Sequence, residues 1–202
     1  MATLHQSIRN HSENSYKTRM VSWLRPTSGG MKSLLSDDGI SLQKAIFWLA
    51  IASIFYAALN HSILFYNNHQ VLIPNISNFV GKVFTSSAIQ LVSYFLFCGV
   101  IHLVSKLFQK NGNLRDYLIV YSFFNAPSIV IFGLISSTWY IFHSIIGLVG
   151  ALLFSLYYLF WLNTIAIAFV YKFRRVSAFV LNFLITAILA SILFALYLNR
   201  FL

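Results

Sequence analysis

Long apolar runs, separated by short polar or basic connections, make up most of this chain of 202 residues. A helix needs about 20 consecutive apolar residues to cross roughly 30 Å of hydrocarbon, and runs of this length recur along the chain. The pattern therefore predicts an all-α fold, a polytopic transmembrane helical bundle with five spans. We expect the spans at about residues 44–66, 83–108, 117–135, 146–171 and 176–199.

One apolar run is longer than a single crossing requires. Residues 140–173 would measure roughly 50 Å as a continuous helix. Residues 137–145, which include Trp139, Tyr140 and Phe142, are predicted to form an interfacial connection, because aromatic rings favour the headgroup level. A division of residues 140–173 into two pieces, which would give six spans, stays open.

Composition supports the assignment to a membrane and changes how the charge is interpreted. The chain is 58% hydrophobic and 9% charged, with a mean hydropathy of +0.74, whereas a soluble domain carries about a quarter charged residues. Its net charge of +10 would favour nucleic acid in a soluble protein. Here the basic residues stand at the span ends, so we expect no nucleic-acid partner and attribute the charge to orientation in the bilayer.

The distribution of Lys and Arg predicts the direction of the spans. Cytoplasmic connections carry an excess of these residues, and an N-terminus on the cytoplasmic side places twelve of the fourteen there. We therefore predict a cytoplasmic N-terminus and a C-terminus on the opposite side. The twelve are Arg9, Lys17, Arg19, Arg25, Lys32, Lys44, Lys106, Lys110, Arg115, Lys172, Arg174 and Arg175, and the other two are Lys82 and Arg200.

The chain is predicted to have two parts. Residues 1–40 form a basic cytoplasmic segment with a short interfacial helix near 31–36, and residues 41–202 form the transmembrane bundle. The first part is Ser-rich and almost free of acidic residues before Asp37. A mitochondrial transit peptide has the same composition and stays an alternative.

The connection before the third span has the composition of a turn followed by a helix start. Residues 111–113 (Asn-Gly-Asn) tolerate positive φ. Asp116 then falls in the first turn of the helix, where the helix dipole favours a carboxylate. We expect it to be an interfacial acid, with Arg115 and Lys110 close enough to pair with it.

Two residues interrupt the third span. Pro127 removes a backbone donor and frees a carbonyl one turn earlier, so we predict a kink in this helix. The Asn125 amide lies about ten residues into the span, roughly 15 Å deep. An unpaired amide is costly at that depth, so Asn125 must have a partner.

Several segments share their order and composition with a known family. They are Arg25-Pro26, the amphipathic piece MKSLLSDDGISL, the span motif YSFFNAP, and the final hinge and helix VYKFRRVSAFVLNFL. Over about residues 21–199 the chain resembles the Yip-domain family, which comprises Rab-interacting membrane proteins of eukaryotes and their bacterial relatives. Its short N-terminal segment is closer to the bacterial-type branch. The resemblance implies five spans, with the N-terminus inside and the C-terminus outside, and binding to membrane proteins or lipids.

The residues that most enzymes and metal sites require are scarce. No HExxH, GxxxxGK[ST] or GxSxG motif occurs, and Asp116 stands apart from the other acids, so we expect no enzyme and no cofactor. Cys98 is predicted to be a packed apolar side chain. No metal is expected, because the histidines predicted at the outer side have no carboxylate or cysteine beside them. These histidines are His61, His69 and His143.

A candidate polar layer crosses the inner half of the bundle. Counting 1.5 Å per residue from the cytoplasmic helix ends places its members about 9–12 Å deep, with Asn125 slightly deeper. One interpretation is interhelical hydrogen bonding. The other is a small polar cavity open to the cytoplasm, with His102 as its titratable group. The members are His102, Tyr121, Asn125, Asn163 and Asn182.

Two functional classes remain. The first is an integral membrane scaffold or an assembly or trafficking factor, whose partners are the lipid bilayer and other membrane proteins or further copies of itself. The second is a small transporter or channel, or an accessory subunit of a larger membrane complex. The bacterial inner membrane is the expected location, with a eukaryotic endomembrane and the mitochondrial inner membrane as alternatives.

Overall fold

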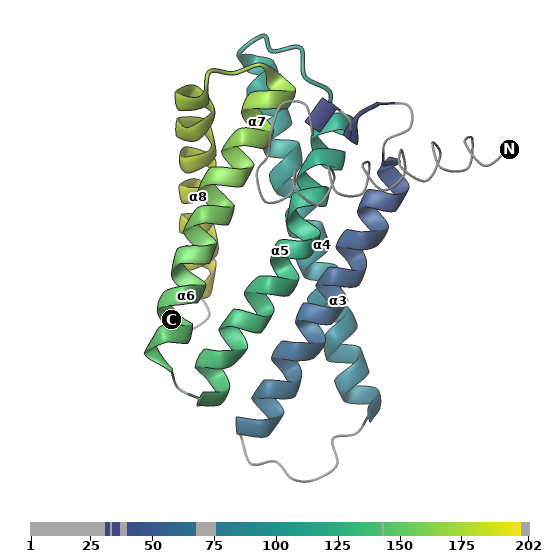
Figure 1. Ribbon diagram of the computed structural model, residues 1–202, viewed down its shortest axis with the longest axis vertical. Coiled ribbons are helices and arrows are strands. Elements are labelled where there is room, and N and C mark those ends of the chain that lie inside the picture. Colours follow the sequence, from purple (N-terminus) through teal and green to yellow (C-terminus); the bar gives the residue numbers. More distant parts are fainter. Residues whose placement is uncertain (1–30, 33, 37–39, 68–75, 143, 199–202) are drawn as a thin grey trace, which may run out of the picture.

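The computed structural model describes residues 31–32, 34–36, 40–67, 76–142 and 144–198, and these residues form helices without any strand (Figure 1). Their helical character follows from the uninterrupted apolar runs, since only a helix satisfies every backbone group within one segment in hydrocarbon. The elements are α3 (Leu42–Asn67), α4 (Ile76–Leu107), α5 (Leu114–Phe142), α6 (Ile145–Leu156), the π-helix η1 (Tyr157–Leu162), α7 (Asn163–Tyr171) and α8 (Arg175–Leu198).

Five helical segments are long and apolar enough to cross a membrane, which confirms the predicted number of spans. The fourth segment runs from Ile145 to Tyr171 through α6, η1 and α7, so residues 145–171 form one span. The π-helix inside it was not predicted. π-Helical turns are rare and occur frequently at functional sites.

The predicted interfacial connection at residues 137–145 is wrong. Residues 137–142 continue α5, and α6 begins at Ile145. The hydroxyls of Ser136 and Ser137 donate hydrogen bonds to the Gly133 carbonyl, at 3.0 and 2.6 Å. Because these side chains bond to their own helix, polar residues are accommodated there without ending it.

Connections between helices gather at the two ends of the bundle. At one end, the ring of Phe108, after α4, lies 6.2 Å from that of Phe173, which precedes α8. Lys110 Nζ lies 5.1 Å from the centre of the same ring. The last turns of α3 and α5 and the first turns of α4 and α6 lie at the opposite end (Figure 1). We call the end that holds Phe108 and Phe173 the basic end.

The described basic residues are divided unequally between these ends. Lys44 lies in the first turn of α3, whereas Lys82 lies near the start of α4. The other described basic residues of the bundle stand in or beside the α4–α5 and α7–α8 connections at the basic end: Lys106, Lys110, Arg115, Lys172, Arg174 and Arg175. We expect a reporter that is active only in the cytoplasm to work when fused before Met1 and to stay silent when fused after Leu202, because the positive-inside bias orients the bundle. A strong cytoplasmic signal from the C-terminal fusion would contradict this topology.

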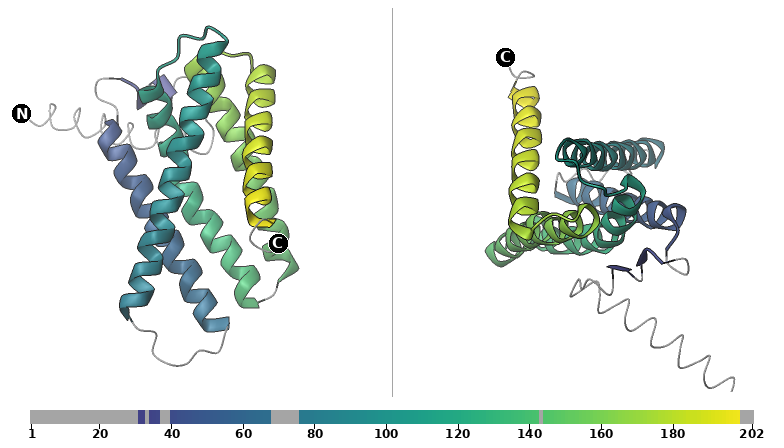
Figure 2. Two further views of the ribbon diagram at one scale, coloured as in Figure 1. Left: turned by 180° about the vertical axis from the view of Figure 1, so that it is seen from behind. Right: turned by 90° about the horizontal axis from the view of Figure 1, so that it is seen from above.

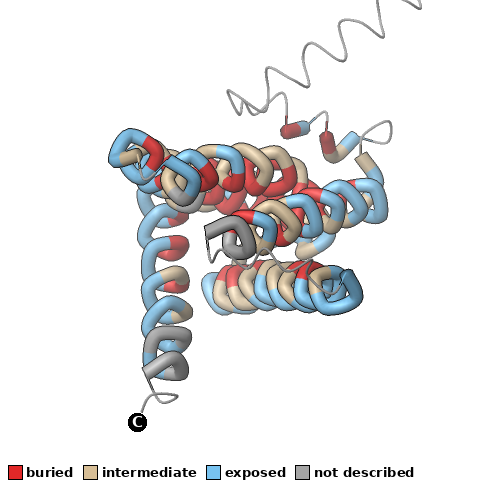
Figure 3. The backbone as a smooth tube through the Cα atoms, turned by 90° about the horizontal axis from the view of Figure 1, so that it is seen from below, coloured by how far each residue is buried: buried red, intermediate tan, exposed pale blue. Residues whose placement is uncertain are grey.

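The helix α5 lies at the centre of the bundle. More than half of its span is buried, whereas each of the other four spans buries less than a third (Figure 3). Close approach of its neighbours depends on glycine. A Cβ added at Gly133 would lie 3.0 Å from Tyr56 of α3, and one added at Gly147 of α6 would lie 2.8 Å from the Trp139 backbone nitrogen.

The segment before α3 packs on the basic end of the bundle. Met31, Lys32 and Leu34 are helical, and Leu35 and Ser36 form a bend. Met31 and Leu34 are each 1% exposed, and Met31 joins the core cluster that contains Tyr117 and Tyr171. Residues 1–30, 33 and 37–39 of the predicted N-terminal segment lie outside the described residues.

Around Pro127, side chains bond to the carbonyls of the preceding turn. Asn125 Nδ2 donates to the Tyr121 carbonyl and Ser128 Oγ to the Phe124 carbonyl, both at 2.8 Å, and α5 continues on both sides.

We expect the axis of α5 to bend by more than about 20° near residues 123–127, the threshold for a sharp kink. Axis angles fitted to an experimental structure test this, and a straight α5 would contradict it.

Candidate functional site

A chain of buried hydrogen bonds joins α5, α7 and α8 near the basic end. The Tyr117 hydroxyl of α5 donates to Asn163 Oδ1 at 2.8 Å. Asn163 Nδ2, at the start of α7, donates to Asn182 Oδ1 of α8 at 2.8 Å. Asn182 Nδ2 in turn donates to Thr164 Oγ1 at the longer distance of 3.5 Å. We call these four residues the asparagine network.

The asparagine network faces the interior of the bundle. Tyr117 and Asn182 are fully buried, and Asn163 is 5% exposed. Asn163 and Asn182 were expected to pair across helices, and they do. Sequence reasoning missed Tyr117 and Thr164. A signal for Tyr117 was present, because it precedes Tyr121 by four residues and therefore lies on the same helical face.

His102 lies outside the asparagine network. Its Nδ1 is 3.0 Å from the hydroxyl of Tyr171, the last residue of α7. The His102–Tyr171 pair contacts the asparagine network through aromatic rings, since the Tyr171 ring centroid lies 5.5 Å from that of Tyr117. The network and the His102–Tyr171 pair are therefore neighbours, held together by aromatic packing.

The other two expected members of the layer have different roles. Tyr121 contributes its ring, which stacks on Phe97 at a centroid distance of 5.8 Å. Its backbone carbonyl accepts the bond from Asn125. Asn125 thus finds its hydrogen-bond acceptor on its own helix, so the five predicted residues do not form one interhelical layer. A side chain that bonds back to the preceding turn cannot be distinguished in sequence from one that reaches across.

Bulky side chains separate the asparagine network from the basic end. Tyr171 is fully buried, and the backbone of Gly112 lies against its ring. A Cβ at Gly112 would lie 2.7 Å from Tyr171 Cε1. Positive φ occurs at Gln109 rather than at Gly112. Close packing, and not a left-handed conformation, therefore explains the glycine in the predicted turn.

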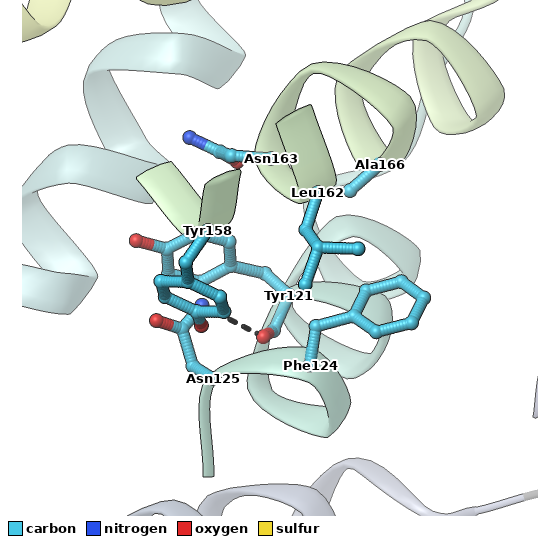
Figure 4. Close-up of a pocket in the computed structure, with 7 residues that line it drawn as sticks. All are labelled: Tyr121, Phe124, Asn125, Tyr158, Leu162, Asn163 and Ala166. Atoms are coloured by element: carbon cyan, nitrogen blue, oxygen red, sulfur yellow. Dashed lines mark hydrogen bonds between the residues drawn. The ribbon is translucent and has the colours of Figure 1, made fainter. Parts of the chain in front are cut away.

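A small cavity lies on the other side of the network, between α5 and η1 (Figure 4). Its volume is about 10 Å³. Two polar atoms at this level have no hydrogen-bond partner within the described part of the chain: Asn125 Oδ1 and the Tyr158 hydroxyl. Ser128 lies near the Tyr158 hydroxyl, and its oxygen, which donates to the Phe124 carbonyl, can still accept a hydrogen bond. The cavity is lined by Tyr121, Phe124, Asn125, Tyr158, Leu162, Asn163 and Ala166.

Tyr158 separates this cavity from two larger clefts that extend toward the end opposite the basic end. The nearer cleft, of about 200 Å³, is lined by Tyr158, Tyr94 and Ser128 among others. The farther one, of about 530 Å³, reaches Asn60 and His61. Both clefts share Tyr56, Gln90 and Phe132. The open space beside the predicted layer thus extends away from the side that we predict to be cytoplasmic.

Asp116 occupies the first turn of α5 as predicted. It makes no ion pair with any residue that the structure describes, and Lys110 lies over the Phe173 ring instead. The helix start is instead capped by Asn113, whose Oδ1 accepts a hydrogen bond from the Arg115 backbone at 3.0 Å. The expected pairing with Lys110 or Arg115 is therefore not seen.

The described residues contain no group of three His, Cys, Asp or Glu side chains that could hold a metal ion. His61 Nε2 lies 2.9 Å from Ser86 Oγ, which joins α3 to α4. His69 and His143 lie outside the described residues. Cys98 is buried in the core, as expected for a packed apolar side chain.

Comparison with known proteins returned no relatives. No protein-family model matches this chain, and no curated protein or solved structure is significantly similar to it. The resemblance to the Yip-domain family therefore depends on the sequence segments described above.

Proposed function

We propose that this protein is an integral membrane scaffold or an assembly or trafficking factor of the Yip-domain type. It acts by binding other membrane proteins or lipids within the bilayer of a bacterial inner membrane. The observation that carries the proposal is the contrast between a polar interior that bonds to itself and wide apolar helix faces that the fold leaves uncovered.

The interior favours a binding role over ion transport. The strongest polar contacts of the spans join protein groups to one another, as in the asparagine network. The central part of each span contains no Asp, Glu, Lys or Arg. Ion and proton pathways usually place ionisable residues there, so this interior is better suited to holding helices together.

The helix α8 provides one wide uncovered face. It packs along one side through residues such as Ala178, Leu181 and Ile185, and stands apart from the rest of the bundle (Figure 2). Its other side is exposed over several turns. In a bilayer such a face meets either lipid or a helix of another protein, and packing between helices drives that association. The exposed residues of this face include Val176, Phe179, Val180, Phe183, Leu184, Ile188 and Ile192.

Crosslinking in native membranes, followed by purification in mild detergent and mass spectrometry, tests the proposal. We expect a reproducible membrane-protein partner that is lost in a variant with Leu184→Trp and Ile188→Trp, because bulky rings on α8 would block helix contact. The matched control is Leu152→Trp on the exposed face of α6, which should retain the partner. Recovery of the chain alone, with neither a partner nor specific lipid, would contradict the proposal.

Transport is a second candidate, favoured by the clefts that lead from Asn60 and His61 to Tyr158. It predicts uptake of a neutral solute by proteoliposomes that contain the purified protein. Narrowing the nearer cleft with Ser128→Phe should then abolish uptake, while the partner contacts on α8 remain.

A further inference from the structure

Two irregular helices face each other at the small cavity between α5 and η1. Pro127 lies inside α5, and η1 replaces α-helical bonding over Tyr157–Leu162. Both features alter the regular hydrogen bonding of a helix. In membrane helices, neighbouring side chains and ordered waters satisfy the groups that such irregularities release. The polar atoms around this cavity therefore indicate what it accommodates.

Asn125 and Tyr158 present buried polar atoms to the cavity. Asn125 is 1% exposed, and its Nδ2 already donates to the Tyr121 carbonyl. Its Oδ1 has no hydrogen-bond partner among the residues that the structure describes, and the same holds for the Tyr158 hydroxyl. An amide oxygen only accepts, whereas a phenol both donates and accepts. A group that bridges them must therefore donate a hydrogen to Asn125.

The size of the cavity limits that group to a single hydroxyl. A volume of about 10 Å³ is close to the minimum that admits one water, and a buried water needs two to four polar partners. Asn125 and Tyr158 supply two. Asn163, on the cavity wall, has a second amide hydrogen beyond the one it donates to Asn182.

The absence of charged residues in the cavity lining also favours a neutral ligand. None of its seven lining residues is ionised at neutral pH, and no carboxylate is present to balance a cation. Burying an uncompensated charge is far more costly than burying a hydroxyl with hydrogen-bond partners. A metal or ammonium ion is therefore disfavoured here.

We propose that this cavity binds a neutral hydroxyl group, which donates a hydrogen bond to Asn125 Oδ1 and pairs with the Tyr158 hydroxyl. The hydroxyl belongs either to a buried water or to an amphiphile whose apolar body lies in the cleft across Tyr158, beside Tyr94 and Phe132. The inference concerns an internal site and does not depend on the proposed scaffold function.

The direction of the stability change in Tyr158→Phe tests the proposal. The change is made in a Ser128→Ala background, which removes the neighbouring serine hydroxyl. If a hydroxyl is bound, Tyr158→Phe loses a hydrogen bond there and Tm falls by roughly 2–4 °C. If nothing is bound, it removes an unsatisfied buried group and Tm rises. Tyr157→Phe is the matched control, since Tyr157 is adjacent but 43% exposed. Its Tm should stay within roughly 2 °C of the parent. An unchanged or raised Tm for Tyr158→Phe overturns the proposal.

A structure in lipid nanodiscs at a resolution that shows waters identifies the source of the hydroxyl. We expect density within about 3 Å of Asn125 Oδ1. An isolated peak indicates water, and density that continues into the cleft indicates an amphiphile. In the second case native mass spectrometry should detect one added mass per chain. Either result supports the bound hydroxyl, whereas the absence of density beside Asn125 at that resolution overturns it.

Discussion

Asn163→Leu is expected to lower the free energy of unfolding by about 2 kcal/mol, since it removes two buried hydrogen bonds at once. The Tyr117 hydroxyl loses its acceptor, and Asn182 Oδ1 loses the donor at 2.8 Å. Hydrogen bonds between membrane helices average about 0.6 kcal/mol and reach about 1.7. The loss therefore exceeds that of a single average bond. Thermal or denaturant unfolding in detergent measures it.

Two further variants make this experiment specific to the asparagine network. The double variant Asn163→Leu with Asn182→Leu should lose less than the sum of the two single losses, because the two residues share a bond. Asn60→Leu is the matched control. Asn60 lines the larger cleft and makes no hydrogen bond with a described residue, so we expect no loss of stability. Strict additivity of the two network variants would contradict the direct coupling.

Gly112→Ala is expected to lower stability by about 1–3 kcal/mol, the usual cost of overpacking. The added Cβ would lie 2.7 Å from Tyr171 Cε1 and 2.8 Å from Cγ. Tyr171 cannot easily move, because it is fully buried, its hydroxyl is 3.0 Å from His102 Nδ1, and its ring contacts Tyr117. Thermal unfolding of the purified variant in detergent checks this prediction.

Two control experiments test whether the contact with Tyr171 causes the loss of stability in Gly112→Ala. Gly99→Ala in α4 meets no atom within 4 Å, and alanine is preferred to glycine inside a helix by about 0.5–1 kcal/mol. This variant should be neutral or more stable. In a Tyr171→Ala background, Gly112→Ala should cost little, since the ring that it would strike is gone. An equal loss in both backgrounds would show that the contact with Tyr171 is not the cause.

Part of the asparagine network was predictable from depth alone. Asn163 and Asn182 stand at similar distances from the basic ends of their helices, and a buried amide needs a partner. Equal depth did not predict that Tyr117 rather than Tyr121 supplies the third group. The two residues share a helical face and differ by about one turn, or roughly 6 Å, along the axis of α5. The choice therefore depends on the height of α5 relative to α7 and α8, which is set by packing against neighbouring helices.

The cavity beside η1 could not have been predicted in the same way. Its wall combines Asn125, which bonds to its own helix, with Tyr158 from a π-helical turn. The segment YYLFWL consists of ordinary apolar span residues and gives no sign of π-helical bonding. A π-helical turn contains an extra residue, so it shifts the angular position about the helix axis of every residue that follows it in the span. The cavity therefore results from the mutual fit of α5 and the fourth span.

The sequence by itself determined that the chain is helical and that it has five segments able to cross a membrane. The reason is that transfer into hydrocarbon is a sum over the residues of one run, and a helix satisfies its backbone within that run. The tertiary structure alone decided which polar groups meet, that Asn125 Oδ1 and the Tyr158 hydroxyl have no hydrogen-bond partner among the described residues, and that Gly112 must stay small beside Tyr171. These features depend on the rotation and relative height of helices that lie far apart in sequence, which no single run specifies.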